Sequence, residues 1–167
     1  MTPLITKPLS SWLVAVTAIS SSLWWSPPAA AYVDPSTGHS TAQKVIRAFD
    51  KPEHNWLPGH RGVDLALEVG EPVLAAGSGV VVFAGNVAGT PTVSIDHSDG
   101  VRTTYQPVFP SVVEGEHVTE GSEIGSLAHA TDGWEGLQWG ARSGPARDEY
   151  LNPLSLLELP TIRLKQI

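Results

Sequence analysis

The 167-residue sequence contains no cysteine, so disulfides contribute nothing to its stability, which must come from an apolar core. It also lacks any cluster of Lys and Arg. Ten basic residues stand against 17 acidic ones, and the formal net charge is −7. An acidic chain without a basic cluster argues against nucleic acid and anionic membrane as partners.

Heptads, helical repeats and low-complexity runs are absent as well. The chain is instead rich in turn formers, with 16 Gly and 14 Pro at a mean hydropathy of −0.01. This composition is typical of a turn-rich β domain rather than of a disordered chain. With 41% hydrophobic and 16% charged residues, the length suits one modest globular domain.

The first 31 residues have the pattern of an export signal. Lys7 is the only charged side chain before an apolar stretch at 13–25, and small residues then precede an expected cleavage after Ala31. A Thr and three Ser interrupt this stretch, which is shorter than the roughly 20 apolar residues that a membrane span needs. We therefore expect a secreted or cell-envelope protein. An uncleaved anchor, which would bring the chain to the membrane, is the alternative.

Beyond the signal at 1–31, the sequence divides into three parts. Residues 32–55 are expected to be a polar linker and lead-in, in which TAQKVIRAF predicts either a short helix or an edge strand. Residues 56–159 are expected to form the domain, and residues 160–167 a C-terminal tail.

Short apolar runs separated by glycine turns fill the expected domain. The stretch EPVLAAGSGVVVFAG indicates two strands around a Gly-Ser-Gly turn. The stretch TVSIDHSDGVRTTYQPV predicts a hairpin through Ser98-Asp99-Gly100, because Asp-Gly supplies the positive φ angles of a tight turn. The stretch SVVEGEHVTEGSEIGSL repeats strand, turn and strand twice more. We predict an all-β, antiparallel domain with little helix.

The Glu-Gly turns of this last stretch also occur in small domains that carry biotin or lipoate. Such a carrier needs a Lys at the tip of a hairpin. No Lys lies between Lys51 and Lys165, so the carrier function is excluded.

The stretch GHRGVDLA places His60 and Asp64 four residues apart, with Gly59 and Gly62 beside them. A catalytic zinc commonly takes three protein ligands from His and carboxylate groups and holds water in the fourth position. The glycines would let the backbone fold closely around an ion. From these residues alone, a metal site and a local hydrogen-bonded pair both stay open.

A wider set of motifs resembles the lysostaphin/LytM-type zinc metallopeptidases, which cut peptide cross-links in bacterial peptidoglycan. The motifs, in order, are GHRGVDLALEVGEPVLAAGSGVVVFAG, TTYQPV, VVEGEHVTEGSEIGSL, LQWGAR and NPLSLL. The resemblance covers residues 45–157 and is strongest to a secreted actinobacterial branch. It implies the duplicated-hybrid-motif fold, a twisted antiparallel sheet with an open groove and zinc on the groove floor.

The same resemblance implies an incomplete active site. The two ligands of the family's HxxxD motif fall on His60 and Asp64, but the third ligand falls on Gln138. The two catalytic His positions fall on Pro107 and Gly136. An amide oxygen is a poor zinc ligand beside an imidazole nitrogen, and general acid/base help is worth roughly 10²–10⁴-fold. We expect no catalytic residue, and zinc binding that is weak or absent.

Three more residues are expected to line the groove. Tyr105 and Trp139 offer aromatic walls for a sugar face or a peptide stem, with packing in the core as the alternative. Arg142 matches an Arg of the family and would pair with a stem-peptide carboxylate, or else with Asp148 or Glu149.

Two further side chains are candidates to replace the missing groups. His129, in the loop ahead of Gly136, is a substitute imidazole and a fourth groove candidate, and Glu135 is a substitute carboxylate. Exposed loop positions are the alternative for both. His97, beside the hairpin turn, is expected on the surface.

Two functions follow. The favoured one is a catalytically inactive LytM-like module of the cell envelope that binds peptidoglycan, a partner hydrolase or a division protein, since degenerate members of the family act as activators. The alternative is a zinc-dependent peptidoglycan endopeptidase with an altered ligand set, in which His129 or Glu135 joins His60 and Asp64.

Overall fold

A computed structural model describes residues 32–130, 133–146 and 148–158. The expected export signal and C-terminal tail lie outside these ranges. Within them the chain forms 11 strands, β1 to β11, and one short 3-10 helix, η1 (Pro153–Leu156). The all-β prediction is confirmed. No helix in the described ranges is long and apolar enough to cross a bilayer.

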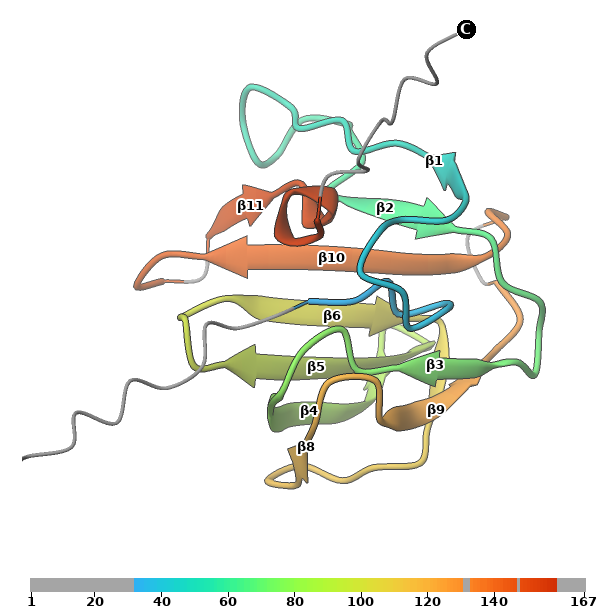
Figure 1. The fold of residues 1–167 in the computed structure, drawn as a ribbon. Helices are drawn as coiled ribbons and strands as arrows, with labels where there is room; N and C mark the ends of the chain where they lie inside the picture. The colour runs from blue at the N-terminus through green and yellow to red at the C-terminus, as the bar shows by residue number, and fades with distance from the viewer. Residues whose placement is uncertain (1–31, 131–132, 147, 159–167) are drawn as a thin grey trace, which may run out of the picture.

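The strands form two antiparallel sheets (Figure 1). The large sheet has the order β1 (Val45–Arg47), β2 (Gly62–Leu65), β10 (Leu137–Ser143), β6 (Arg102–Gln106), β5 (Thr90–His97), β4 (Gly79–Val87) and β8 (His117–Val118), and β11 (Glu149–Leu151) also pairs with β10. The small sheet has the order β3 (Pro72–Leu74), β9 (Glu123–Leu127) and β7 (Val108–Pro110).

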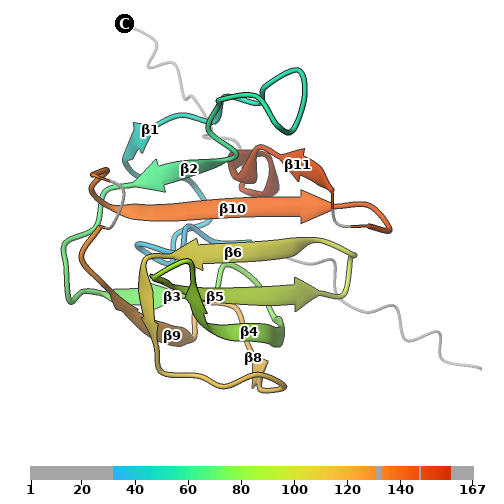
Figure 2. The same cartoon turned by 180° about the vertical axis from the view of Figure 1, so that it is seen from behind.

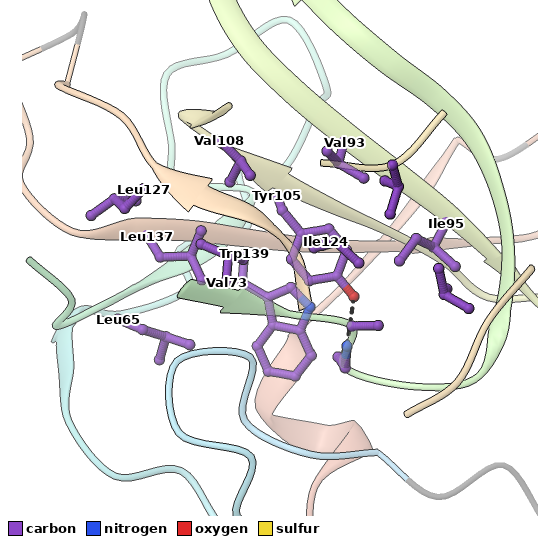
Figure 3. Packing of buried hydrophobic residues seen from close by; sticks show 14 of the residues in the cluster. Leu65, Val73, Val93, Ile95, Tyr105, Val108, Ile124, Leu127, Leu137 and Trp139 are labelled. Atoms are coloured by element: carbon purple, nitrogen blue, oxygen red, sulfur yellow. Dashed lines mark hydrogen bonds between the residues drawn. The ribbon is translucent and has the colours of Figure 1, made fainter. Parts of the chain in front are cut away.

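The core lies where the small sheet packs on one face of the large sheet. Its buried side chains come from both sheets, with Val73, Ile124 and Val108 from the small one and Leu65 and Ile95 among those from the large one (Figure 3). Seen from behind, the opposite face of the large sheet carries no second sheet (Figure 2). That face holds the groove described below.

The expected turns are largely confirmed. β5 and β6 form the predicted hairpin, and Gly100 has the positive φ of 88° that its turn needs. β3 and β4 correspond to the two strands expected around the Gly-Ser-Gly turn, but they belong to different sheets, so the turn crosses between layers.

The first part of residues 32–55, the expected linker and lead-in, packs against the domain. Tyr32 and Val33 are only 6% and 7% exposed. The buried Asp34 carboxylate accepts hydrogen bonds from the backbone N–H groups of Ser36 and Gln43, which closes the segment into a compact loop. The following stretch forms the edge strand β1, so of the two alternatives for TAQKVIRAF the strand is correct.

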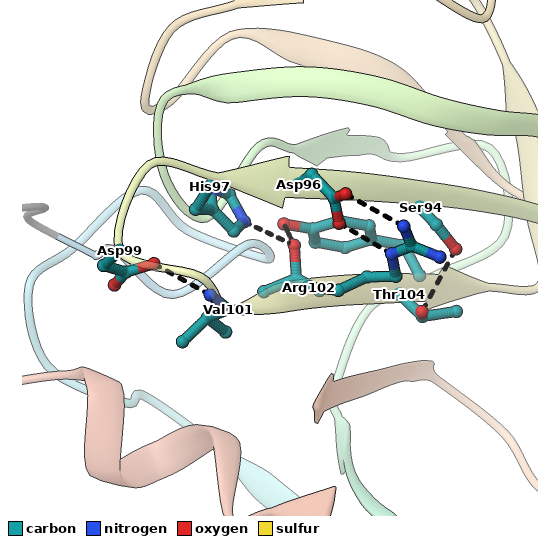
Figure 4. A network of polar contacts seen from close by, with 9 residues as sticks. Ser94, Asp96, His97, Asp99, Val101, Arg102 and Thr104 are labelled. Atoms are coloured by element: carbon teal, nitrogen blue, oxygen red, sulfur yellow. Dashed lines mark hydrogen bonds and ion pairs between the residues drawn. The ribbon is translucent and has the colours of Figure 1, made fainter. Parts of the chain in front are cut away.

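His97 is buried, which contradicts the expectation of a surface position. Its Nδ1 lies 2.9 Å from the carbonyl oxygen of Ser78. Its Nε2 lies 2.8 Å from the Thr103 hydroxyl, the contact drawn as a dashed line from His97 in Figure 4. The Tyr105 hydroxyl lies 2.8 Å from the same Thr103 oxygen and accepts a hydrogen bond from the backbone N–H of Ala76. These bonds satisfy polar groups that the core would otherwise leave unpaired.

This buried network predicts a loss of stability in alkali. Desolvation raises the pKa of Tyr105 to about 12, whereas a phenol in the unfolded chain ionises near pH 10. Between about pH 10 and pH 12 the unfolded chain therefore binds fewer protons than the folded chain, and the free energy of unfolding falls. In urea unfolding between pH 10 and pH 12, the free energy of unfolding should fall less steeply with pH in Tyr105→Phe than in the wild type. Equal slopes would show that Tyr105 does not control this loss.

Candidate functional site

His60 and Asp64 meet at the beginning of β2. His60 Nε2 lies 3.0 Å from Asp64 Oδ1, and both side chains are 4% exposed. His60 Nδ1 lies 2.8 Å from the carbonyl oxygen of Ala48. A carbonyl only accepts, so Nδ1 is the donor of this bond, and Nε2 is the ring nitrogen that faces Asp64. Nε2 faces the Asp64 carboxylate oxygen at close range, an arrangement that two ligands of one cation could also adopt.

Neighbouring strands fix the loop that carries His60. His60 and Asp50 exchange two backbone hydrogen bonds of 2.8 and 2.9 Å. A Cβ at position 59 would lie 2.7 Å from the Asp50 carbonyl oxygen, and one at position 62 would lie 2.6 Å from the Trp139 carbonyl oxygen. Gly59 and Gly62 therefore permit close approach, as expected, but the groups that approach are protein backbone.

The side-chain amide of Gln138, the residue at the expected third ligand position, is hydrogen-bonded within the protein. Gln138 on β10 lies directly opposite Asp64 on β2 and Gln106 on β6. The Gln106 amide donates a hydrogen bond to Gln138 Oε1, the one atom of that amide able to bind a cation. No group of three His, Cys, Asp or Glu able to hold a metal occurs among the described residues. His60 and Asp64 are two side chains able to ligate zinc, but the donor set does not fit a three-ligand catalytic zinc site.

A positive side chain lies beside the carboxylate. Arg47 on β1 pairs in register with Asp64, and its Nη1 lies 3.8 Å from Asp64 Oδ2. The Arg47 guanidinium lies 4.0 Å above the ring of Trp134. The sequence alone does not reveal Arg47 as a site residue, because only the pairing of β1 with β2 brings it beside Asp64.

The two positions expected to carry catalytic histidines are close to this pair. Pro107 and Gly136 line a small cavity of about 130 Å³ together with Asp64 and Gln138. Gly136 has a φ of 89°, and a Cβ there would lie 2.4 Å from the carbonyl oxygen of Leu65. The turn before β10 therefore has no room for a side chain.

Residues 58–153 match peptidase family M23. This chain belongs to peptidase family M23. The family depends on zinc in general, and the predicted lysostaphin/LytM-type relationship is confirmed.

The chain is 50% identical over 127 residues to an uncharacterized protein of Mycobacterium tuberculosis strain H37Rv. The aligned region covers 74% of this chain and 51% of that protein. It thus spans about half the length of the curated relatives it matches.

Two solved structures share the M23 fold at low sequence identity. The catalytic domain of the antimicrobial peptidase lysostaphin from Staphylococcus simulans aligns with a TM-score of 0.56 and 22% identity, over 67% of this chain and 90% of that chain. The SpoIIQ–SpoIIIAH pore-forming complex aligns with a TM-score of 0.59 and 22% identity, over 77% of this chain and 92% of that chain. At these identities the comparisons show the fold alone.

Two predicted groove residues of the M23 domain lie in the core instead. Tyr105 and Trp139 are both 0% exposed, and their rings pack among the buried side chains (Figure 3). Strand alternation explains the error, because Gln106 and Gln138, one residue away on the same strands, line the groove. The alternative of core packing is correct.

The groove of the M23 domain is an open cavity of about 800 Å³. Arg142 lines it, as predicted, with its guanidinium carbon 5.9 Å from the centre of the Tyr150 ring. The alternative partners Asp148 and Glu149 form no ion pair with it among the described residues.

Neither substitute ligand of the M23 site lies near His60 and Asp64. His129 is exposed and lines neither the groove nor the cavity beside Asp64. It follows β9, which belongs to the small sheet, so its prediction as a groove residue is wrong. Glu135 is exposed and lines a different cavity, beside Lys44.

Proposed function

We propose that this M23 domain is a binding module of the cell envelope that does not hydrolyse its ligand. One observation carries the proposal. At the expected third ligand position stands a Gln, and its side-chain carbonyl oxygen accepts a hydrogen bond from Gln106. Zinc could use only the second lone pair of this oxygen, which is a weak neutral ligand beside an imidazole nitrogen. We infer that zinc is bound weakly or not at all.

The catalytic positions support the same proposal. A metal-bound water needs a fully ligated ion to become a nucleophile at neutral pH, and amide cleavage needs a group that moves a proton. Pro107 has no titratable side chain, and Gly136 has none and no room for one. The loss of acid/base help alone would reduce the rate by roughly 10²–10⁴-fold.

The proposed ligand is peptidoglycan or a protein partner, such as a cell-wall hydrolase or a division protein. The open groove next to the His60–Asp64 pair is large enough for an extended chain. The similar fold in the SpoIIQ–SpoIIIAH pore-forming complex supports a role in protein assembly. The expected export signal supports secretion or retention in the cell envelope.

The proximity of His60 and Asp64 favours a second function, that of a zinc-dependent peptidoglycan endopeptidase. His60 Nε2 faces Asp64 Oδ1, as two ligands of one cation could. This alternative requires a third ligand, which neither His129 nor Glu135 supplies in the described arrangement.

An assay on purified cell walls separates the two functions. We expect residues 32–167 to contain far less than one zinc per chain by elemental analysis, to sediment with walls or with a wall-associated protein, and to release no peptide with or without added zinc. One zinc per chain together with chelator-sensitive release of peptide would replace the proposal with the endopeptidase.

A further inference from the structure

The outer edge of β4 is open along its second half. β4 lies near one end of the strand order of the large sheet (Figure 1), and β8 pairs only with Gly79 and Val80. The backbone of Val81 bonds to the turn at 115–116. No strand of the described chain pairs with the outer side of residues 83–87. The last five residues of this nine-residue strand therefore have one free edge.

The turn after β4 determines which backbone groups point away from the sheet. Val87 and Thr90 face each other across a two-residue turn, Ala88-Gly89, with φ angles of 50° and 90°. The residues that flank such a turn form a hydrogen-bonded pair, and bonded and non-bonded pairs alternate along an antiparallel ladder. Ala84 and Asn86 are therefore the residues whose N–H and C=O groups point outward from β5.

This edge lacks the features that usually keep sheet edges from pairing. Natural proteins protect an exposed edge with charges, prolines or bulges. Residues 72–95 contain no charged side chain, although the chain has ten basic and 17 acidic residues. The bulge of β4 lies before Phe83, and residues 83–87 contain no proline. The opposite edge strand, β1, is different, because Lys44 precedes it and Arg47 is its last residue.

The free stretch of β4 is complementary to a second copy of itself. Gly85 is its middle residue. A two-fold axis through Gly85 would set Ala84 opposite Asn86 of the second copy, and Asn86 opposite Ala84 of the second copy. Each pair would exchange two hydrogen bonds, so the outward N–H and C=O groups of both copies would all be satisfied. The two glycines would face each other at the closer spacing of the ladder, about 4.5 Å between Cα atoms.

Side chains on the groove face fit the same axis. Phe83 and Val87 both line the groove, and Val87 is 51% exposed. A Cβ at Gly85 would lie 3.3 Å from Phe83 Cζ, so the Phe83 ring lies over the glycine. The two-fold axis sets Phe83 opposite Val87 of the second copy. Aromatic and β-branched side chains in this relation stabilise antiparallel strands, and the axis produces two such pairs.

We propose that two copies of this domain associate through residues 83–87 of β4 as an antiparallel, two-fold symmetric dimer. The two large sheets form one continuous sheet, and both grooves lie on the same side of it. The net charge of −7 opposes contact between copies, which favours the charge-free edge as the place where they meet. The interface is short, so the dimer is weak. This proposal does not depend on the proposed function.

Sedimentation equilibrium of the expected mature chain, residues 32–167, tests the proposal. We expect a reversible equilibrium of monomer and dimer between about 10 μM and about 1 mM, where weak complexes dissociate. Amide hydrogen exchange at the same concentrations locates the contact, because exchange at Ala84 and Asn86 should slow as the dimer forms. A monomer at every concentration would overturn the proposal. A dimer with unchanged exchange at both amides would also overturn it.

Variants of the edge separate strand pairing from general association. Asn86→Pro removes two of the four hydrogen bonds between copies and keeps the ladder with β5, because the Asn86 N–H points outward. Val87→Lys places like charges at the contact. Each should raise the dissociation constant at least about tenfold. Two variants are made so that one that fails to fold does not decide the result.

Val69→Lys is the matched control for the added charge. Val69 is also 51% exposed and lies between β2 and β3, away from β4 in the strand order. Its substitution should change the dissociation constant less than twofold. An equal rise in Val69→Lys and Val87→Lys, or no rise in Asn86→Pro, would contradict pairing through β4.

Discussion

Gln138→His is expected to turn this domain into a zinc-binding protein. The new imidazole would stand opposite Asp64 in the sheet, beside His60 Nε2, and would complete three strong ligands. It would also remove the amide oxygen that now bonds to Gln106. Because even groups that only orient a ligand are worth 10–100-fold in metal affinity, we expect zinc affinity to rise by more than about 100-fold, measured by competition with a chromogenic chelator.

Thr104→His is the matched control for this change. It adds the same side chain to the groove surface on β6, two residues from Gln106 along the strand. It should leave zinc affinity unchanged. Peptide release from walls should stay absent in Gln138→His, since Pro107 and Gly136 still supply no acid or base. If zinc binding did not rise in Gln138→His, the assignment of Gln138 to the third ligand position would be wrong.

Gly136→Ala is expected to destabilise the domain by about 3–5 kcal/mol, the range of severe single substitutions. The backbone there has a φ of 89°, which costs other residues about 1–2 kcal/mol. The added Cβ would also lie 2.4 Å from the Leu65 carbonyl oxygen and 2.8 Å from Ile46 Cδ1, so β1 or β2 would have to shift. Thermal unfolding should show a melting temperature lower by roughly 10–20 °C.

Gly89→Ala is the control for the backbone effect alone. Gly89 has nearly the same φ, 90°, but no atom lies within 4 Å of its Cβ position. We expect a loss of about 1 kcal/mol there. Similar losses in both variants would mean that strand packing does not exclude a side chain at Gly136.

The surroundings of Gly136 bear on the proposed loss of activity. At Gly136 the chain does not simply lack a His, because Leu65 and Ile46 now pack where its Cβ would begin. A His at this position would have to displace strand backbone. This crowding favours the proposed binding function over residual catalysis.

Local pattern was enough to predict the hairpin and the proximity of His60 and Asp64. The Asp-Gly turn has a fixed backbone requirement, which Gly100 meets. The His60 and Asp64 ligands come from one short segment, so their spacing in sequence carries over into space.

Strand pairing and sheet packing determine the features of the site that the sequence does not reveal. Tyr105 and Trp139 share strands with Gln106 and Gln138, and only packing of the small sheet shows which face is buried. Arg47 reaches Asp64 because β1 pairs with β2 across a long loop. His97 is buried because its two ring nitrogens meet partners from separate segments. None of these contacts has a signature in the neighbouring sequence.

Diffraction at the zinc absorption edge tests the central claim most directly, using crystals grown with one equivalent of zinc. The account predicts no anomalous peak between His60 and Asp64, and an intact hydrogen bond from Gln106 to Gln138. A full-occupancy peak, ligated tetrahedrally by His60, Asp64, a third protein group and a water molecule, would contradict it.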